Sequence, residues 1–155
     1  MKTSSILLIV NTLLLIVIWA FTGVKYAGLP EIIPTHFDIH GNVNSESGKM
    51  TIWLLPCIAA VIHFLFILKS NNPDSPFVNV PKSFHNQKNW KLYLFTLQVP
   101  IMVLFLDIIV ESIRIAERKQ TELSNVIYFI LAVLLAMIAI GFIKSMKEGV
   151  TKSND

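Results

Sequence analysis

Histidine and aspartate alternate in one short segment of this sequence, at His36, Asp38 and His40. Side chains two residues apart lie on the same face of an extended strand, so we expect these three to face one way. Imidazole and carboxylate groups gathered in this manner are ligands that a metal ion could use. The alternative is a polar strand edge whose side chains hydrogen-bond to neighbouring loops. We favour this alternative and predict no bound metal or other cofactor.

A second acidic group, Asp107 and Glu111, lies four residues apart in an apolar segment. An ionisable residue inside a membrane-spanning helix is costly, so Asp107 must face protein or trapped water. We expect both carboxylates to form a cluster with Asp38 that clamps a loop to the helix end, and the alternative is a metal or acid–base site there. At 100° per residue the same helical stripe continues through Arg114, Arg118 and Glu122. This stripe predicts that the helix extends past the membrane edge as an amphipathic segment.

Three further polar residues interrupt apolar segments at similar depths. Asn11, His63 and Gln98 each lie five or six residues from one end of their segments. Polar side chains at one depth can hydrogen-bond across helices, which is worth roughly 0.6–2 kcal/mol per contact. We therefore predict an inner polar layer that holds three helices together. A proton-relay role for His63 is the alternative, although no acidic residue shares its depth.

Four apolar runs, residues 6–24, 50–68, 92–112 and 125–143, carry these polar groups. Each run is long enough to cross a hydrocarbon core of about 30 Å as an α-helix. The whole sequence is 54% hydrophobic and 15% charged, whereas a typical soluble domain is about 25% charged. We therefore predict an all-α integral membrane protein, with a four-helix transmembrane bundle that makes up a single membrane domain over residues 1–155. A soluble enzyme tethered by one helix is excluded, because too little sequence remains for a second core.

The connections between the runs differ in character. Residues 25–49 are too apolar for a solvated loop. Pro30 and Pro34 impose extended backbone on the residues before them, and Gly41 begins a turn signal. We predict a structured cap loop with a short strand or hairpin, packed on the helix ends. Residues 69–91 contain three prolines, which predict an irregular connector.

The distribution of basic residues predicts the orientation in the membrane. Eight Lys and Arg residues lie on the side of the termini and of residues 69–91, and five lie on the other side. The positive-inside rule then places both termini in the cytoplasm and the cap loop outside. This topology accounts for the net charge of +3, and we predict no nucleic-acid partner. The single cysteine, Cys57, excludes an intramolecular disulfide.

The cap loop resembles a bacterial membrane domain of unknown function that forms the amino-terminal part of the SdpI-type immunity proteins. The resemblance covers roughly residues 15–60 and rests on Leu-Pro at 29–30, Ile-Pro-Thr-His-Phe at 33–37, Gly41, and Gly-Lys at 48–49. The family-motif residues, which we call the hallmark residues, are Pro34, His36, Phe37, Gly41 and Lys49. The resemblance implies a multi-pass protein of the bacterial cytoplasmic (inner) membrane in which this loop is the hallmark. SdpI-type proteins protect the producing cell from a secreted toxin.

These features favour a binding or protective module that engages a peptide or protein partner through its outer cap. One alternative is a small metal-dependent membrane enzyme or ion-coupled transporter that uses the outer His, Asp and Glu residues. Another is an accessory subunit of a membrane complex. The expected partners are the lipid bilayer, a peptide or protein, and a second copy of the chain, since small residues on the last run permit close helix packing. No arrangement of a nucleophile with a base is evident, so nothing in the sequence requires catalysis.

Overall fold

The structure is a computed structural model that describes residues 2–71 and 86–151, with side chains described up to residue 143. Within these residues, four helical segments are long and apolar enough to cross a membrane: Thr3–Tyr26, Lys49–Ser70, Gln87–Ala116 and Val126–Ile143. This confirms the predicted fold class, an all-α multi-pass membrane protein with four spans. The three prolines of the predicted 69–91 connector, Pro73, Pro76 and Pro81, lie outside the described residues.

The elements follow one another as α1 (Thr3–Tyr26), β1 (Ile32–Phe37), β2 (Val43–Gly48), the 3-10 helix η1 (Lys49–Trp53), α2 (Leu54–Ser70), α3 (Gln87–Ala116) and α4 (Val126–Thr151). Both α2 and α3 extend beyond the predicted runs into the connector, and α3 begins where the Asn86 side chain accepts a hydrogen bond from the Lys88 amide at 2.9 Å. Helix α4 continues eight residues past the predicted run, to Thr151.

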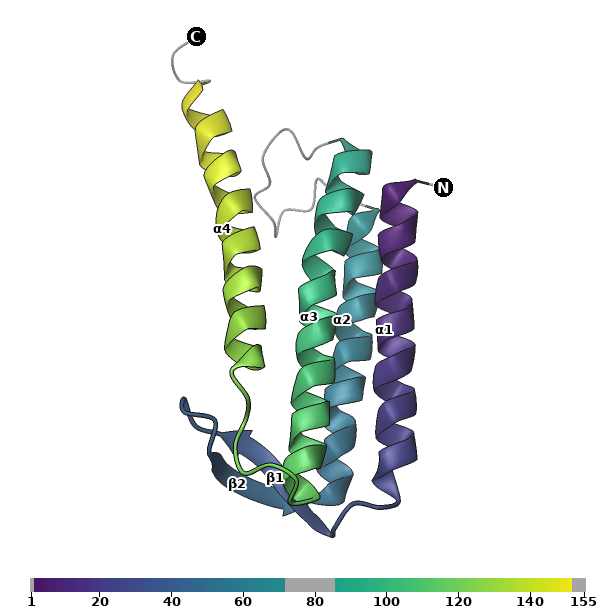
Figure 1. Ribbon diagram of the computed structural model, residues 1–155. Coiled ribbons are helices and arrows are strands. Elements are labelled where there is room, and N and C mark those ends of the chain that lie inside the picture. The colour runs from purple at the N-terminus through teal and green to yellow at the C-terminus, as the bar shows by residue number, and fades with distance from the viewer. Residues whose placement is uncertain (1, 72–85, 152–155) are drawn as a thin grey trace.

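Helices α1, α2 and α3 pack as a bundle, whereas α4 stands apart from α1 and α2 and packs on α3 (Figure 1). The β1–β2 hairpin lies across one end of the bundle and reaches beneath α4. The beginning of α1 and the end of α4 lie at the opposite end of the molecule. The hairpin therefore forms the cap that the apolar character of residues 25–49 predicts.

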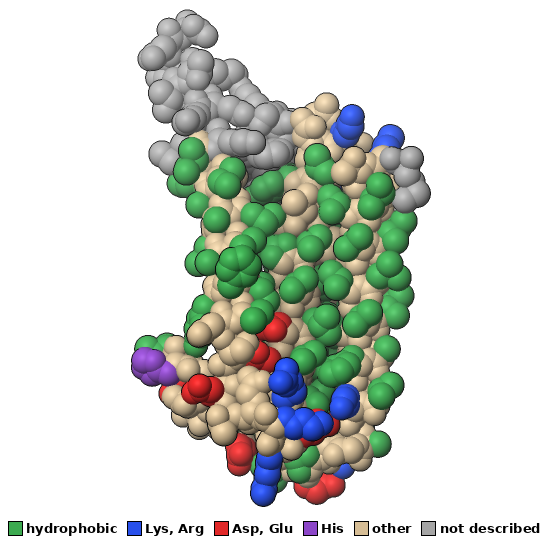
Figure 2. Space-filling view, viewed as in Figure 1, with side chains coloured by type: hydrophobic (Ala, Val, Ile, Leu, Met, Phe, Trp, Pro, Cys, Tyr) green, Lys and Arg blue, Asp and Glu red, His purple; other side chains and the backbone are tan. Residues whose placement is uncertain are grey.

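The surface has the layering of a membrane protein. Hydrophobic side chains cover the helices along their length, and acidic side chains gather with Lys and Arg at the hairpin end (Figure 2). Aromatic rings mark the same end: Trp53 lies 5.7 Å from Trp19 and 5.5 Å from Tyr26 between ring centroids. Trp and Tyr favour this level because one part of the ring system is apolar and another can hydrogen-bond.

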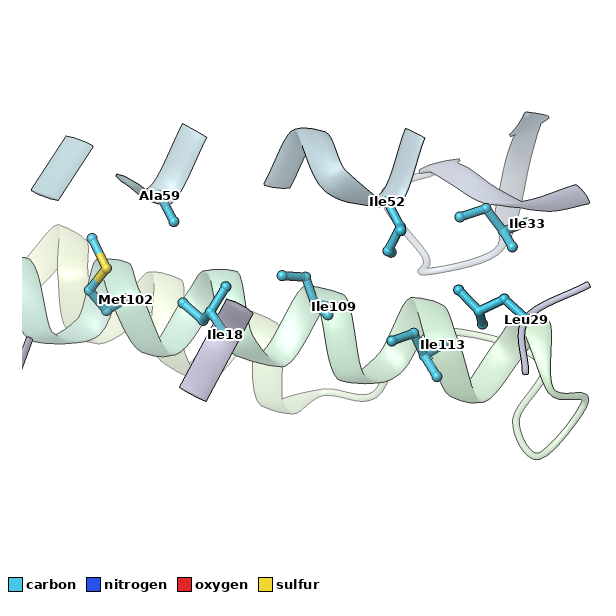
Figure 3. Packing of buried hydrophobic residues seen from close by; sticks show 8 residues of the cluster. All are labelled: Ile18, Leu29, Ile33, Ile52, Ala59, Met102, Ile109 and Ile113. Atoms are coloured by element: carbon cyan, nitrogen blue, oxygen red, sulfur yellow. The ribbon is translucent and has the colours of Figure 1, made fainter. Parts of the chain in front are cut away.

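The main apolar core runs from the middle of the bundle to the cap (Figure 3). Ile18 of α1 and Ile109 of α3 are fully buried, and Ile113 is 1% exposed. Ile33 of β1, at 2% exposure, belongs to the same cluster. The hairpin is therefore part of the core and not an appendage, because it supplies one of the core's most buried side chains.

Helix α3 ends earlier than the predicted amphipathic stripe requires. It ends at Ala116, and Arg118 then adopts a left-handed conformation with φ 57°. The backbone amides of Arg118 and Lys119 turn back and donate hydrogen bonds to carbonyls of the last turn, those of Ile115 and Arg114 respectively. The prediction of one helical stripe through Arg118 and Glu122 is therefore wrong, because a helix end lies between them and Glu111.

Candidate functional site

The hairpin turn is organised by Asp38. Its Oδ1 accepts hydrogen bonds from the backbone amides of His40 at 2.8 Å and Asn42 at 2.9 Å, and its Oδ2 accepts one from the Asn42 side chain at 3.1 Å. The Asn42 side chain and amide, together with the His40 amide, hold the pKa of the Asp38 carboxyl below its usual value. Asp38 therefore closes a turn in the way that Asx residues commonly do.

This turn overturns the predicted alternation of His36, Asp38 and His40 along one strand face. Strand β1 ends at Phe37, and its pairing with β2 shifts in register on both sides of His36. Because Asp38 folds the chain into a turn, His40 lies beyond the strand and cannot share a face with His36. No group of three or more His, Cys, Asp or Glu residues among the described residues is placed to hold a metal ion.

The base of the hairpin is held by Lys49. Its Nζ lies 2.9 Å from Glu31 Oε1, its backbone amide donates to the Glu31 carbonyl at 2.9 Å, and its Nζ lies 5.6 Å from the centre of the Tyr26 ring. A single lysine thus joins both ends of the hairpin to the end of α1. The carboxylate of Glu31 is 84% exposed, so water screens the ion pair and it contributes little to stability.

The tip of the hairpin is held against the α3–α4 connection. Gly41 has φ 86°, and its carbonyl oxygen accepts a hydrogen bond from the Leu123 amide at 2.9 Å. A Cβ at Gly41 would lie 3.1 Å from the Leu123 carbonyl oxygen, so both the backbone conformation and the close approach favour glycine. Tyr128 of α4 donates to the Ile39 carbonyl at 2.9 Å. The cap therefore links α1, α3 and α4.

The acidic pair on α3 reaches this tip indirectly. Glu111, which is 6% exposed, accepts hydrogen bonds from the Ser124 amide at 2.8 Å and from the Ser124 hydroxyl. It thus anchors the residues just before α4, next to the Leu123 contact with Gly41. Asp107 makes no hydrogen bond to the described residues, and its Oδ2 is buried. The predicted cluster is wrong in one respect, because Asp38 bonds within its own turn and not to either α3 carboxylate.

At the other end of the bundle, the structure brings the inner polar residues together. Gln98 Nε2 lies 3.0 Å from His63 Nδ1, His63 Nε2 lies 3.2 Å from the Thr12 hydroxyl, and Asn11 Nδ2 donates to the Phe95 carbonyl at 2.9 Å. Thr12 itself donates to the Leu8 carbonyl, so its oxygen is left to accept from His63 Nε2, while His63 Nδ1 accepts from the Gln98 amide. These bonds join α1, α2 and α3 at one level.

Two hollows adjoin the hairpin. The first, the membrane-side pocket, is a cavity of about 290 Å³ between β1, the start of α2 and the later turns of α3. Three hallmark residues, Pro34, His36 and Phe37, line it, and Leu54 and Ile58 of α2 form another wall. Three residues of the sequence motif thus meet at one cavity.

The second hollow, which we call the charged hollow, has a volume of about 470 Å³. Its lining includes Ile32 and Pro34 of β1, with Glu31 just before that strand. Glu46 of β2 and Arg118, which follows α3, complete the charged part of the lining. Pro34 lines both hollows, and it is the residue that their linings share. The two hollows therefore adjoin each other at β1.

Comparison with known proteins supports the domain but assigns no activity. Residues 13–60 match the family model described as "Domain of unknown function (DUF1648)". An uncharacterized protein of Archaeoglobus fulgidus is 23% identical over 90 residues, which are 54% of this chain and 49% of that protein. This chain therefore matches about half the length of that relative. No solved structure matches the chain. The match confirms that a domain of unknown function covers most of the predicted segment, residues 15–60, and it does not test the likeness to SdpI-type immunity proteins.

Several residues of the site were not singled out from the sequence. Ser124 lies two residues before α4, where a serine is a common helix-capping residue, and this signal could have identified it. Its partner on α3 could not be inferred from local sequence. No local sequence signal marks Leu123, Thr12 or Tyr128, because their roles come from backbone and side-chain contacts between distant segments.

Proposed function

We propose that this protein is a binding module of protective type, which engages a membrane-active peptide or protein partner through its cap. The observation that carries the proposal is the charged hollow beside the hairpin, where Glu31 and Glu46 lie next to apolar residues. Glu46 is exposed and makes no ion pair with the described part of the chain. Its carboxylate is therefore free to pair with a basic group of a partner. The resemblance to SdpI-type immunity proteins supports the same function.

A basic amphipathic peptide suits this surface. Membrane-active peptides commonly carry Lys and Arg on one face and apolar residues on the other. The unpaired carboxylate of Glu46 attracts the basic face, and Ile32, which is 56% exposed, offers an apolar contact. Opposite charges at the rim of an interface speed association and add specificity more than raw affinity.

We further propose that the cap lies outside the cytoplasmic membrane and that both termini lie in the cytoplasm. The excess of basic residues on the terminal side supports this orientation. A cysteine placed at Asn44 in a Cys57→Ser background tests it. An impermeant maleimide added to intact cells should label that cysteine, whereas labelling only after lysis would place the cap in the cytoplasm.

The binding function is tested by charge reversal at the hollow. In lipid nanodiscs, the protein should bind a synthetic Lys-rich amphipathic helical peptide more tightly than its Gln-substituted analogue, and Glu46→Lys should weaken binding about tenfold. Glu122→Lys is the matched control, because it makes the same charge change on an exposed residue outside the hollow. Cells that produce the protein should also tolerate more of the peptide. Equal binding by both variants, or no gain in tolerance, would contradict the proposal.

A further inference from the structure

The membrane-side pocket opens toward the bilayer. Leu54 and Ile58 both line it, and they are 61% and 47% exposed. Both residues belong to the segment Lys49–Ser70, which is long and apolar enough to cross a membrane. The wall of the pocket therefore continues into a surface that contacts hydrocarbon, so a ligand can enter sideways from the lipid.

The chemistry of the lining changes along the pocket. Leu55, Ile58 and Ile108 form apolar walls on α2 and α3. The hairpin contributes His36 and Ser47 at the cap end, and neither side chain hydrogen-bonds to any described residue. These groups can therefore donate to a ligand without breaking an existing bond. An apolar cavity with polar donors at one end is complementary to an amphiphile.

We propose that this pocket holds one acyl chain of a bilayer phospholipid, with the lipid's ester and phosphate oxygens at His36 and Ser47. The volume of about 290 Å³ is at the lower end of the range for ligand pockets, which suits one chain and not a whole lipid. This site differs from the proposed peptide surface, because the two hollows share Pro34 alone among the residues that line them.

Selection of the lipid comes from the polar end of the pocket. A chain that moves from the bilayer into an apolar cavity gains no hydrophobic free energy, since both environments exclude water. Packing and the hydrogen bonds to His36 and Ser47 must therefore retain the lipid. This explains why a histidine of the sequence motif lies at a cavity and has no partner within the described protein.

Native mass spectrometry tests the site. The protein is first reconstituted with phosphatidylglycerol and phosphatidylethanolamine and is then released from detergent in the spectrometer. The wild-type protein should retain one phospholipid. Ile58→Trp fills the pocket and should lower the retained fraction about tenfold, whereas Leu65→Trp, at another lipid-exposed position of α2, should keep it. His36→Ala should lower retention about fivefold, as expected for one lost hydrogen bond.

The result decides in either direction. Retention that falls in Ile58→Trp and His36→Ala but not in Leu65→Trp supports the site. Absence of retained phospholipid from the wild-type protein, or equal retention in all variants, overturns it. If circular dichroism shows that Ile58→Trp does not fold, the phospholipid retained by His36→Ala decides whether the site exists, because His36 is an exposed residue whose replacement should not disturb folding. Binding of the basic peptide, measured on the same samples, should not change, so the two proposals can fail separately.

Discussion

Replacement of Glu111 should release α4 from the cap while leaving the other three helices packed. Glu111 is 6% exposed and accepts two hydrogen bonds from Ser124, whose hydroxyl also accepts from the Val126 amide at the start of α4. Helix α4 packs on α3, and this anchor lies directly before its first turn. A change at Glu111 should therefore act locally on α4.

The expected magnitude follows from the two bonds. Hydrogen bonds to a charged group are worth about 1.5–3 kcal/mol each, so Glu111→Leu, which keeps an apolar side chain of similar size, should cost about 3–6 kcal/mol. Glu111→Gln can still accept from the Ser124 amide and donate to its hydroxyl, but it lacks the charge, so it should cost about 1 kcal/mol. Asp107→Asn is the control, because Asp107 makes no hydrogen bond to the described residues.

Two measurements separate local release from global unfolding. Unfolding in mixed detergent and SDS micelles, followed by circular dichroism, gives the free-energy change. Hydrogen exchange measured by mass spectrometry should rise at residues 41–42 and 122–130 in Glu111→Leu, and exchange in α1 should stay as in the wild type. The tryptophans all lie outside α4, so their emission should also stay unchanged. A Glu111→Leu protein within about 0.5 kcal/mol of wild type, or one that exchanges faster in α1 as well, would refute the reasoning.

Three further outcomes are expected. Gln98→Leu should lower stability by roughly 0.6–2 kcal/mol in the same unfolding assay, because it removes the buried bond to His63. Gly41→Ala should lower stability by at least about 1 kcal/mol, since it adds a Cβ at φ 86° against the α3–α4 connection. Gly28→Ala is the control and should change stability less, because its Cβ would lie at an ordinary 3.7 Å from the Lys25 carbonyl oxygen. Because hydrogen bonds lower the pKa of Asp38, its stabilisation of the turn is complete above the ordinary aspartate pKa of about 3.9 and is lost as pH falls through the lowered folded-state value. Amide exchange at residues 40 and 42, measured by NMR, should show this loss, and Asp38→Asn should remove the pH dependence.

Local sequence determines much of this fold because the bilayer imposes a simple rule. A spanning helix needs about 20 apolar residues and must satisfy its own backbone, so the four spans can be read directly from the runs of apolar residues. Proline, glycine and apolar residues likewise predict the structured cap, and equal depth in the bilayer places Asn11, His63 and Gln98 at one level. Each of these inferences depends on composition or on position along one segment.

Only the tertiary structure decides which groups meet. The expected His36–Asp38–His40 face fails because Asp38 bonds two backbone amides ahead of it and ends the strand, and strand pairing alone cannot reveal this. Glu111 was expected to face the cap loop, whereas its hydrogen-bond partner is Ser124, which follows a helix end that the periodic stripe did not reveal. The membrane-side pocket and the charged hollow arise only when β1 is placed against α2 and α3. Contacts between segments far apart in sequence depend on packing geometry, which the hydrophobic pattern of each segment does not specify.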